Sequence, residues 1–347
     1  MEESMGMYIN AYATVRDEIP GPYSQQRGTD DPQLAEHLQG FTGFVWERGG
    51  QEMTSSMFGL IRHIGDTRRQ YVFEREDLRG LEEWAEQTNS VFFMPDGSVV
   101  NARGEDIVAG GAVPYHPAAR ERALRVRAGI TKDTGATLPG HYPPVRGEAE
   151  AVLREPREIA DRILSLIAVS ELAGFFLGES APPLEAVRGV LPGAFDTLTP
   201  AERRFIELLE SGVTAETDSP AGEEARHAAT QLAWQAVAAQ MLAHVAGIRE
   251  IPEGQIVVDP WPLVKWVADN GEDAVRERAR ALIPLPRICD MYEFVHSMRW
   301  IAVDEQLHPE EPATIDEQTA GTLLEWHRAL SWLFNVDADW DDVDLST

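Results

Sequence analysis

The stretch from Pro286 to His308 constrains the fold more than any other part of this chain. Its apolar residues recur at helical spacing, which predicts a helix with one face buried among other helices. The apolar residues are Ile288, Met291, Val295, Met298 and Ala302. A second stripe on the other side carries Cys289, Glu293, His296 and Trp300. This helix is therefore the first place to look for a functional site.

The remainder of the second half is also predicted to be helical. From Pro156 onward, apolar residues follow helical spacing, and Pro, Ser, Thr or Asp stands where helices should begin. Thr199–Glu202 and Thr314–Glu317 have the pattern of capping boxes. Six tryptophans fall within residues 156–335, and we expect their rings to fill space between helices rather than to form a ligand cage. They are Trp234, Trp261, Trp266, Trp300, Trp326 and Trp332.

The first 110 residues are predicted to form a different kind of domain. Alternating β-branched and aromatic residues, with turn signals between them, predict strands at 8–15, 57–64, 70–73, 91–94 and 98–101. Helical spacing predicts helices at 31–46 and 77–88. The order strand, helix, strand, strand, helix, strand is that of a ferredoxin-like α/β sandwich. The predicted fold class is therefore α+β, with this sandwich followed by an all-helical domain.

The charge along the chain marks the domain boundaries. The formal net charge is −28, but residues 111–150 carry six Lys and Arg against four Asp and Glu. We therefore divide the chain into a domain at 1–110, a basic, Gly/Pro-rich linker at 111–150 and a helical domain at 151–335. Residues 336–347 contain five aspartates and few apolar groups, so they are predicted to be a frayed acidic tail.

The same composition excludes several classes of partner. A strongly acidic chain repels nucleic acid, whereas it favours a basic protein partner. No apolar run approaches the roughly 20 residues needed to cross a bilayer. The N-terminus lacks the layout of a signal peptide, so a cytoplasmic location is expected. Cys289 is the single cysteine, so no disulfide is expected within one chain.

Two Glu-x-x-His units raise the possibility of a metal site. They are Glu224–His227 and Glu293–His296. Di-metal carboxylate proteins use this spacing twice and add single glutamates from two other helices, a role open here to Glu171 and Glu325. Against this hypothesis, the first unit lies in the opening turns of its helix, where carboxylates favour the helix dipole. The main interpretation therefore has no cofactor. The alternative is iron or manganese bound by the two Glu-x-x-His units.

Nucleophilic catalysis has less support. The chain contains no Gly-x-Ser-x-Gly elbow, no Walker loop and no G-x-G-x-x-G fingerprint. Cys289 and His296 lie about two helical turns apart, or roughly 10 Å, which is too far for a direct ion pair. Glu325 and Arg328, one turn apart, are expected to form a helix pair. Together with Cys289 and Trp300, they complete the candidate binding residues.

Several segments of the helical half resemble a known family. These segments are Arg157–Leu164, Leu198–Ile206, Trp234–Gly247, Ile288–Trp300 and Glu325–Leu333. In type and order they are similar to the bacterial domain-of-unknown-function family 4272 (DUF4272), over roughly residues 152–335. The resemblance implies an α-helical fold and brings no assigned activity.

These observations favour a non-enzymatic binding protein. Its acidic surface would meet a basic partner, as in a toxin-neutralising immunity protein. The alternative is a di-metal carboxylate oxidoreductase that uses the two Glu-x-x-His units.

Overall fold

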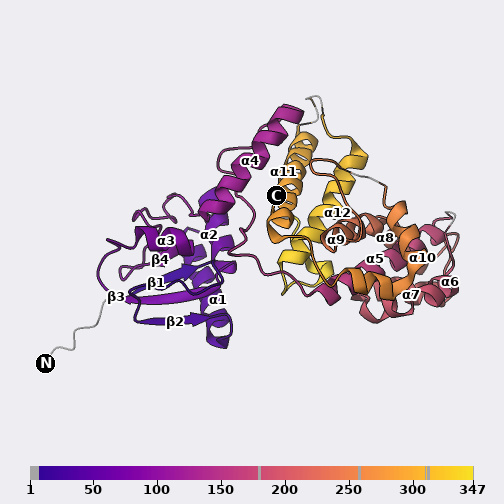
Figure 1. Ribbon diagram of the computed structural model, residues 1–347, viewed down its shortest axis with the longest axis horizontal. Helices are drawn as coiled ribbons and strands as arrows, with labels where there is room; N and C mark the ends of the chain where they lie inside the picture. The colour runs from indigo at the N-terminus through magenta and orange to yellow at the C-terminus, as the bar shows by residue number, and fades with distance from the viewer. Residues whose placement is uncertain (1–7, 179–180, 257–258, 309, 311–312, 347) are drawn as a thin grey trace. The chain divides into compact units, whose positions relative to one another are not determined.

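The computed structural model describes residues 8–178, 181–256, 259–308, 310 and 313–346. The chain divides into two compact units (Figure 1). The N-terminal unit comprises Met1–Arg125 and Pro139–Ala151, and the helical unit comprises Val126–Leu138 and Val152–Thr347. Helix α4 (Pro117–Thr134) lies in the predicted linker, and its two ends belong to different units.

The N-terminal unit is built on a five-stranded antiparallel sheet of order β2-β3-β1-β4-β5. Its strands are β1 (Tyr8–Ala13), β2 (Gln25–Gly28), β3 (Arg69–Glu74), β4 (Ser90–Phe93) and β5 (Val99–Val100). In the central strand, Tyr12 stands opposite Gln70 of β3 and Val91 of β4. Successive side chains point to opposite faces, so both faces of the sheet can bury apolar groups.

Helices cover both faces of this sheet. Helices α1 (Pro32–Arg48) and α2 (Ser55–Gly65) pack on the face that carries Tyr12 and Val91. The short helix α3 (Glu82–Thr88) packs on the other face, where the Trp84 ring meets Tyr71 and Phe73 edge to face at 5.0 and 5.1 Å. The unit therefore has a core on each side of the sheet.

The predicted strand at 57–64 is wrong, because this segment is helix α2. Thr54 caps the helix, with its hydroxyl oxygen accepting from the Met57 amide at 3.1 Å. Met57, Leu60 and Ile64 are buried at helical spacing, while neighbouring apolar residues made the segment resemble a continuous strand. The element order β1-β2-α1-α2-β3-α3-β4-β5 accordingly differs from the predicted ferredoxin-like order. Strand β2, with the sequence QQRG, was not predicted because it lacks apolar residues.

The prediction of a helical second half is confirmed. The α-helices are α5 (Pro156–Phe176), α6 (Leu184–Val190), α7 (Pro200–Glu210), α8 (Pro220–Leu232), α9 (Gln235–Val245), α10 (Trp261–Arg278), α11 (Leu285–Leu307) and α12 (Glu317–Phe334). The 3-10 helices are η1 (Pro192–Thr197) and η2 (Trp340–Asp342). Among the residues that the structure describes, no helix is both long enough and apolar enough to cross a membrane.

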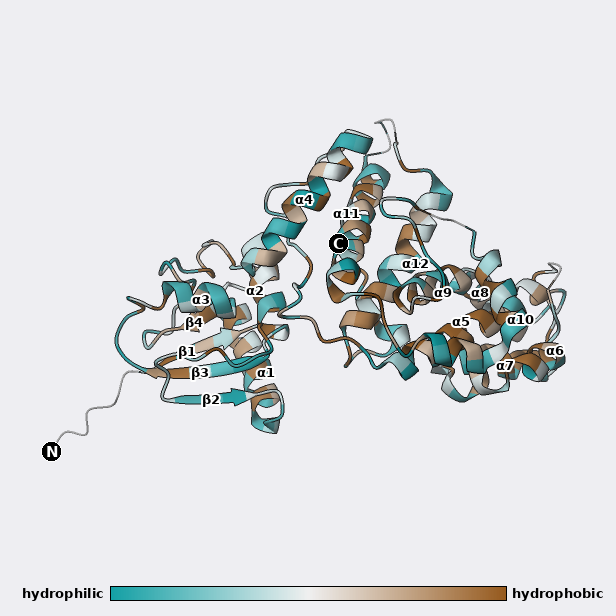
Figure 2. Cartoon of the chain, in the orientation of Figure 1, coloured by the Kyte–Doolittle hydropathy of each residue, from teal (hydrophilic) through white to brown (hydrophobic). Residues whose placement is uncertain are grey.

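Helices α5 and α9 form the core of the helical unit. Every residue of α9 is buried, and α5 is apolar around most of its circumference (Figure 2). A helix that is hydrophobic on all sides must be surrounded by others. Helices α8, α9 and α10 pack against α5, and α12 packs against α9. Trp326 and Trp332 fill this interior as predicted, whereas Trp234 and Trp261 are exposed.

Candidate functional site

Helix α11 buries both of the stripes that the sequence distinguishes. The predicted apolar residues are buried, and so are Cys289, Glu293 and His296 on the other stripe. Trp300 is half-buried and packs against an apolar cluster that includes Ile130 and Met298. Helix α11 packs against α12, and its Met298 shares an apolar cluster with Ile130 of α4, so both stripes are covered by neighbouring elements.

The Glu293 carboxylate is completely buried and is held by an arginine. Its Oε1 accepts from Nε of Arg127 at 3.0 Å and from Nη2 at 2.7 Å, and the Ser297 hydroxyl lies 3.4 Å away. Arg127 belongs to α4, and its side chain is 16% exposed. A buried carboxylate is tolerated when a guanidinium group neutralises it in this way. Glu293 is therefore already engaged in an ion pair.

Two histidines meet between α11 and α12. His296 Nδ1 and His327 Nε2 lie 3.4 Å apart, and both rings are buried. The Tyr292 ring lies 6.2 Å from each imidazole, and its hydroxyl is 2.9 Å from Ser331 Oγ. When two imidazoles share a hydrogen bond, one nitrogen donates and the other accepts, so at least one ring is neutral. The pair can therefore hold a shared proton between the two helices.

Three members of this cluster, Tyr292, His327 and Ser331, were not among the predicted site residues. The signal was present, because Tyr292 stands four residues before His296, and His327 four residues before Ser331. Residues four apart lie on one helix face. What the sequence did not indicate was that these two faces pack against each other.

Glu325 and Arg328 form the predicted pair on α12, with Oε2 and Nη1 3.6 Å apart. Glu325 is only 6% exposed, and burial raises the pKa of its carboxyl to about 7 against an ordinary value of 4.5. Arg328 opposes this shift without cancelling it. A carboxyl with such a pKa changes its charge near neutral pH.

The structure does not bring the two Glu-x-x-His units together at a metal site. Glu224 and His227 are exposed on α8, which packs against α5 and α7. Hydrogen bonds from Arg204 at 2.8 and 2.9 Å hold the Glu224 carboxylate and lower its pKa. Across the described parts of the chain, no three His, Cys, Asp or Glu side chains gather where they could hold a metal ion.

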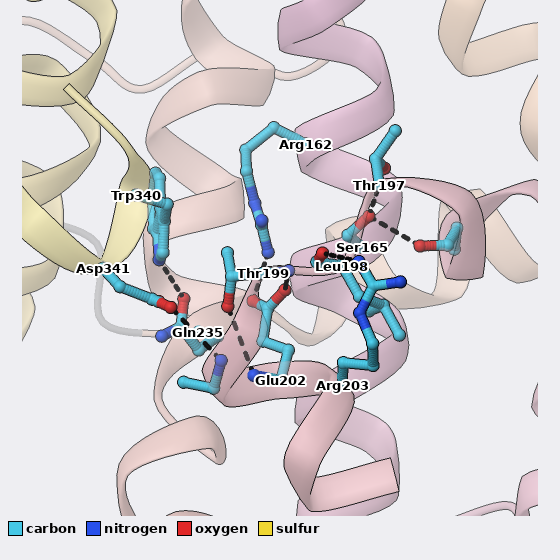
Figure 3. A network of polar contacts seen from close by, with 12 residues as sticks. Arg162, Ser165, Thr197, Leu198, Thr199, Glu202, Arg203, Gln235, Trp340 and Asp341 are labelled. Atoms are coloured by element: carbon cyan, nitrogen blue, oxygen red, sulfur yellow. Dashed lines mark hydrogen bonds and ion pairs between the residues drawn. The ribbon is translucent and has the colours of Figure 1, made fainter. Parts of the chain in front are cut away.

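A second buried polar network connects α5 to α7 (Figure 3). Arg162 of α5 forms an ion pair with Glu202 of α7, and both side chains are almost fully buried. Glu202 also completes the predicted capping box. Its amide donates to Thr199 Oγ1 at 3.2 Å, and its Oε2 accepts from the Thr199 amide at 2.9 Å. One carboxylate therefore both caps a helix and neutralises a buried arginine.

The prediction that the C-terminal residues are frayed is wrong around Trp340, because this network holds Trp340 and Asp341 in place. Trp340 is buried, with its ring 5.0 Å from the Arg162 guanidinium, and its indole donates to Gln235 Oε1 at 3.2 Å. Asp341 Oδ2 accepts from the Ala201 amide at 3.3 Å (Figure 3). The acidic charge of this stretch obscured the anchoring effect of its single tryptophan.

The beginning of this stretch is fixed as well. Arg154 donates from Nε to the Trp332 carbonyl at 2.8 Å and from Nη2 to the carbonyls of Asn335 and Ala338. We call residues 335–346 the acidic segment. Its five aspartates are all exposed, although Trp340 between them is buried. They are Asp337, Asp339, Asp341, Asp342 and Asp344.

These observations define a helical domain whose interior charges are mostly paired and whose acidic C-terminal segment is part of the fold. The chain belongs to the family described as Domain of unknown function (DUF4272), whose model matches residues 122–343. The predicted resemblance is thereby confirmed, and the match includes the acidic segment as far as Val343. No curated protein and no solved structure matches this chain.

Proposed function

We propose that this protein is a non-catalytic binding protein that recognises a basic protein partner through the acidic segment of its helical unit. The observation that carries the proposal is the arrangement of this segment. Its aspartates are exposed, while Trp340 and the contacts of Arg154 hold its backbone against the bundle. A segment ordered before binding loses less conformational entropy when a partner docks.

The charge of the helical unit supports the same function. This unit contains 17 Lys and Arg against 36 Asp and Glu, a net charge of −19, whereas the N-terminal unit has 13 against 22, or −9. Burial changes this balance little, because Arg154 and Arg162 are buried together with three glutamates, Glu202, Glu293 and Glu325. An excess of exposed negative charge attracts cationic partners and speeds their association.

Titration with a cationic probe tests this function. The full chain is titrated with a synthetic Lys/Arg-rich peptide by calorimetry, at low salt and at about 0.3 M salt. We expect saturable binding that weakens with salt, because exposed charges are screened. Changing Asp337, Asp339, Asp342 and Asp344 to Asn should weaken binding by about tenfold or more, since each exposed charge pair contributes roughly 0.2–1 kcal/mol.

The matched control removes the same charge elsewhere on the helical unit. Glu185, Glu216, Glu223 and Asp273 are exposed acids outside the acidic segment, and they are changed to Gln or Asn. This control should lose much less affinity than the segment variant. An equal loss in both variants, or no binding by the unaltered chain, would reject recognition through the acidic segment.

The two Glu-x-x-His units lead to a separate expectation about metals. Protein purified without chelators should contain no stoichiometric iron or manganese by elemental analysis, because Arg204 holds Glu224 and Arg127 holds Glu293. Stoichiometric metal that disappears in Glu293→Ala would instead favour the di-metal oxidoreductase. Glu317→Ala, at an exposed carboxylate of α12, is the control.

A further inference from the structure

The N-terminal unit contains a cavity of about 200 Å³ that plays no part in the function proposed above. Its wall is formed by the end of α3, the start of β4, the turn after β5, residues 112–115 and Arg120 of α4. Pockets for drug-sized ligands begin at roughly 300 Å³, so this cavity suits a smaller molecule. All of its lining residues belong to one unit and precede the region that the family model matches.

A buried asparagine fixes one side of the cavity. Asn89 ends α3 with a left-handed backbone, at φ 49° and ψ 64°. Its side-chain nitrogen donates to Thr14 Oγ1 at 2.8 Å and to Glu150 Oε1 at 2.9 Å. These contacts hold Asn89 and the start of β4 in one position, so this wall exists before any ligand arrives.

A second buried asparagine, Asn101, fixes another part of the wall. Asn101 Oδ1 accepts from the Arg103 amide at 2.9 Å, and its side-chain nitrogen donates to Glu105 Oε2 at 2.7 Å and to the Ala112 carbonyl at 3.0 Å. The turn that carries Arg103 is therefore tied to the 112–115 segment. Positioning by neighbouring hydrogen bonds of this kind is typical of prepared binding sites.

Two arginines that line the cavity, Arg103 and Arg120, have positive charge that is unpaired within the described residues. Among the residues that the structure describes, neither Arg103 nor Arg120 forms an ion pair or a hydrogen bond through its guanidinium group. By contrast, Arg122 on the same helix as Arg120 is buried and donates to the carbonyls of Val145 and Arg146. Arg103 and Arg120 thus both line one cavity and have uncommitted guanidinium groups.

The chemistry of the rim indicates the ligand. Guanidinium groups bind the oxygens of carboxylates and phosphates through paired hydrogen bonds. Of the two acids that line the cavity, Glu105 is already bonded to Asn101, and Glu86 can accept from a donor group on the same ligand. We propose that this cavity is a binding site for a small oxyanion-bearing molecule, a carboxylate or a phosphate, held by Arg103 and Arg120.

Titration with simple anions tests the site. Inorganic phosphate, malonate and chloride are titrated into the full chain and followed by calorimetry and by two-dimensional NMR of the backbone amides. We expect phosphate or malonate to bind saturably and to shift the amides of residues 89–90 and 101–105, whereas chloride should not. The preferred oxyanion distinguishes a phosphate ligand from a carboxylate ligand.

Variants separate the site from general charge effects. Arg103→Gln and Arg120→Gln should each weaken oxyanion binding by roughly tenfold or more, because a charge-assisted hydrogen bond is lost. Arg27→Gln removes the same charge from the same unit outside the cavity and should leave binding unchanged. Absence of saturable binding by both oxyanions, or equal weakening in all three variants, would overturn the proposal.

Discussion

Replacing Glu202 by alanine should lower the free energy of unfolding by about 3–5 kcal/mol, the cost of removing one partner from a buried ion pair. Arg162 would keep its charge at a position where it is only 5% exposed. Its Nε already lacks a hydrogen-bond partner among the described residues, so little nearby could compensate. The α7 capping box would be lost as well. Urea unfolding at neutral pH, followed by circular dichroism, measures the change.

Two further variants distinguish the buried charge from the cap. Glu202→Gln removes the charge but keeps an oxygen that can accept from the Thr199 amide. If the buried charge dominates, this variant should lose most of the stability that Glu202→Ala loses. Combining Glu202→Gln with Arg162→Met removes both charges and should recover part of the lost stability. A cost below about 1 kcal/mol for Glu202→Gln would show that the ion pair contributes little.

An exposed pair on the same helix provides the control. Glu207 lies 3.8 Å from Arg204, and both side chains are more than half exposed. Exposed ion pairs of this kind contribute little, so Glu207→Ala should change stability by less than about 1 kcal/mol. The contrast between Glu202 and Glu207 isolates the effect of burial.

The helical half could be predicted because its signals are local. The capping box at Thr199–Glu202 and the apolar spacing of α11 are contained within a few turns of sequence, and both are present. The partners of these elements are not local. Arg162 lies 40 residues before Glu202, and Arg127 lies 166 residues before Glu293, so no spacing rule connects them. The family resemblance implied a helical fold but did not identify these pairs.

The wrong predictions had physical causes of the same kind. In the segment 57–64, helix and strand patterns both matched the apolar residues, and the cap at Thr54 decided between them. In the acidic segment, five aspartates suggested solvation, but the buried Trp340 anchors the segment through contacts with Arg162 and Gln235. Because these partners lie far away in sequence, the segment alone could not indicate the anchoring. In both segments, the structure depends on contacts with other residues that local composition does not indicate.

Glu325 should make the helical unit less stable as the pH rises from about 4.5 to about 7. Its folded pKa of about 7 lies above the ordinary 4.5, so the folded state keeps a proton that the unfolded state has lost. The stability that protonated Glu325 contributes is therefore fully present below its unfolded pKa. It is lost as pH rises towards its folded pKa. The whole change is about 3 kcal/mol, at about 1.4 kcal/mol per pKa unit.

Comparison of the unaltered chain with Glu325→Gln reveals this effect. The variant should be nearly as stable as the unaltered chain at about pH 5 and more stable by up to about 3 kcal/mol at about pH 8. The difference between the two proteins is needed because burial lowers the pKa of His63 and His244, which reduces stability as pH falls in both proteins. Urea unfolding at unit pH steps provides the two curves.

Glu317→Gln, at an exposed position of the same helix, should give a curve parallel to that of the unaltered chain. If the Glu325→Gln curve is parallel as well, burial of this carboxyl does not control its ionisation.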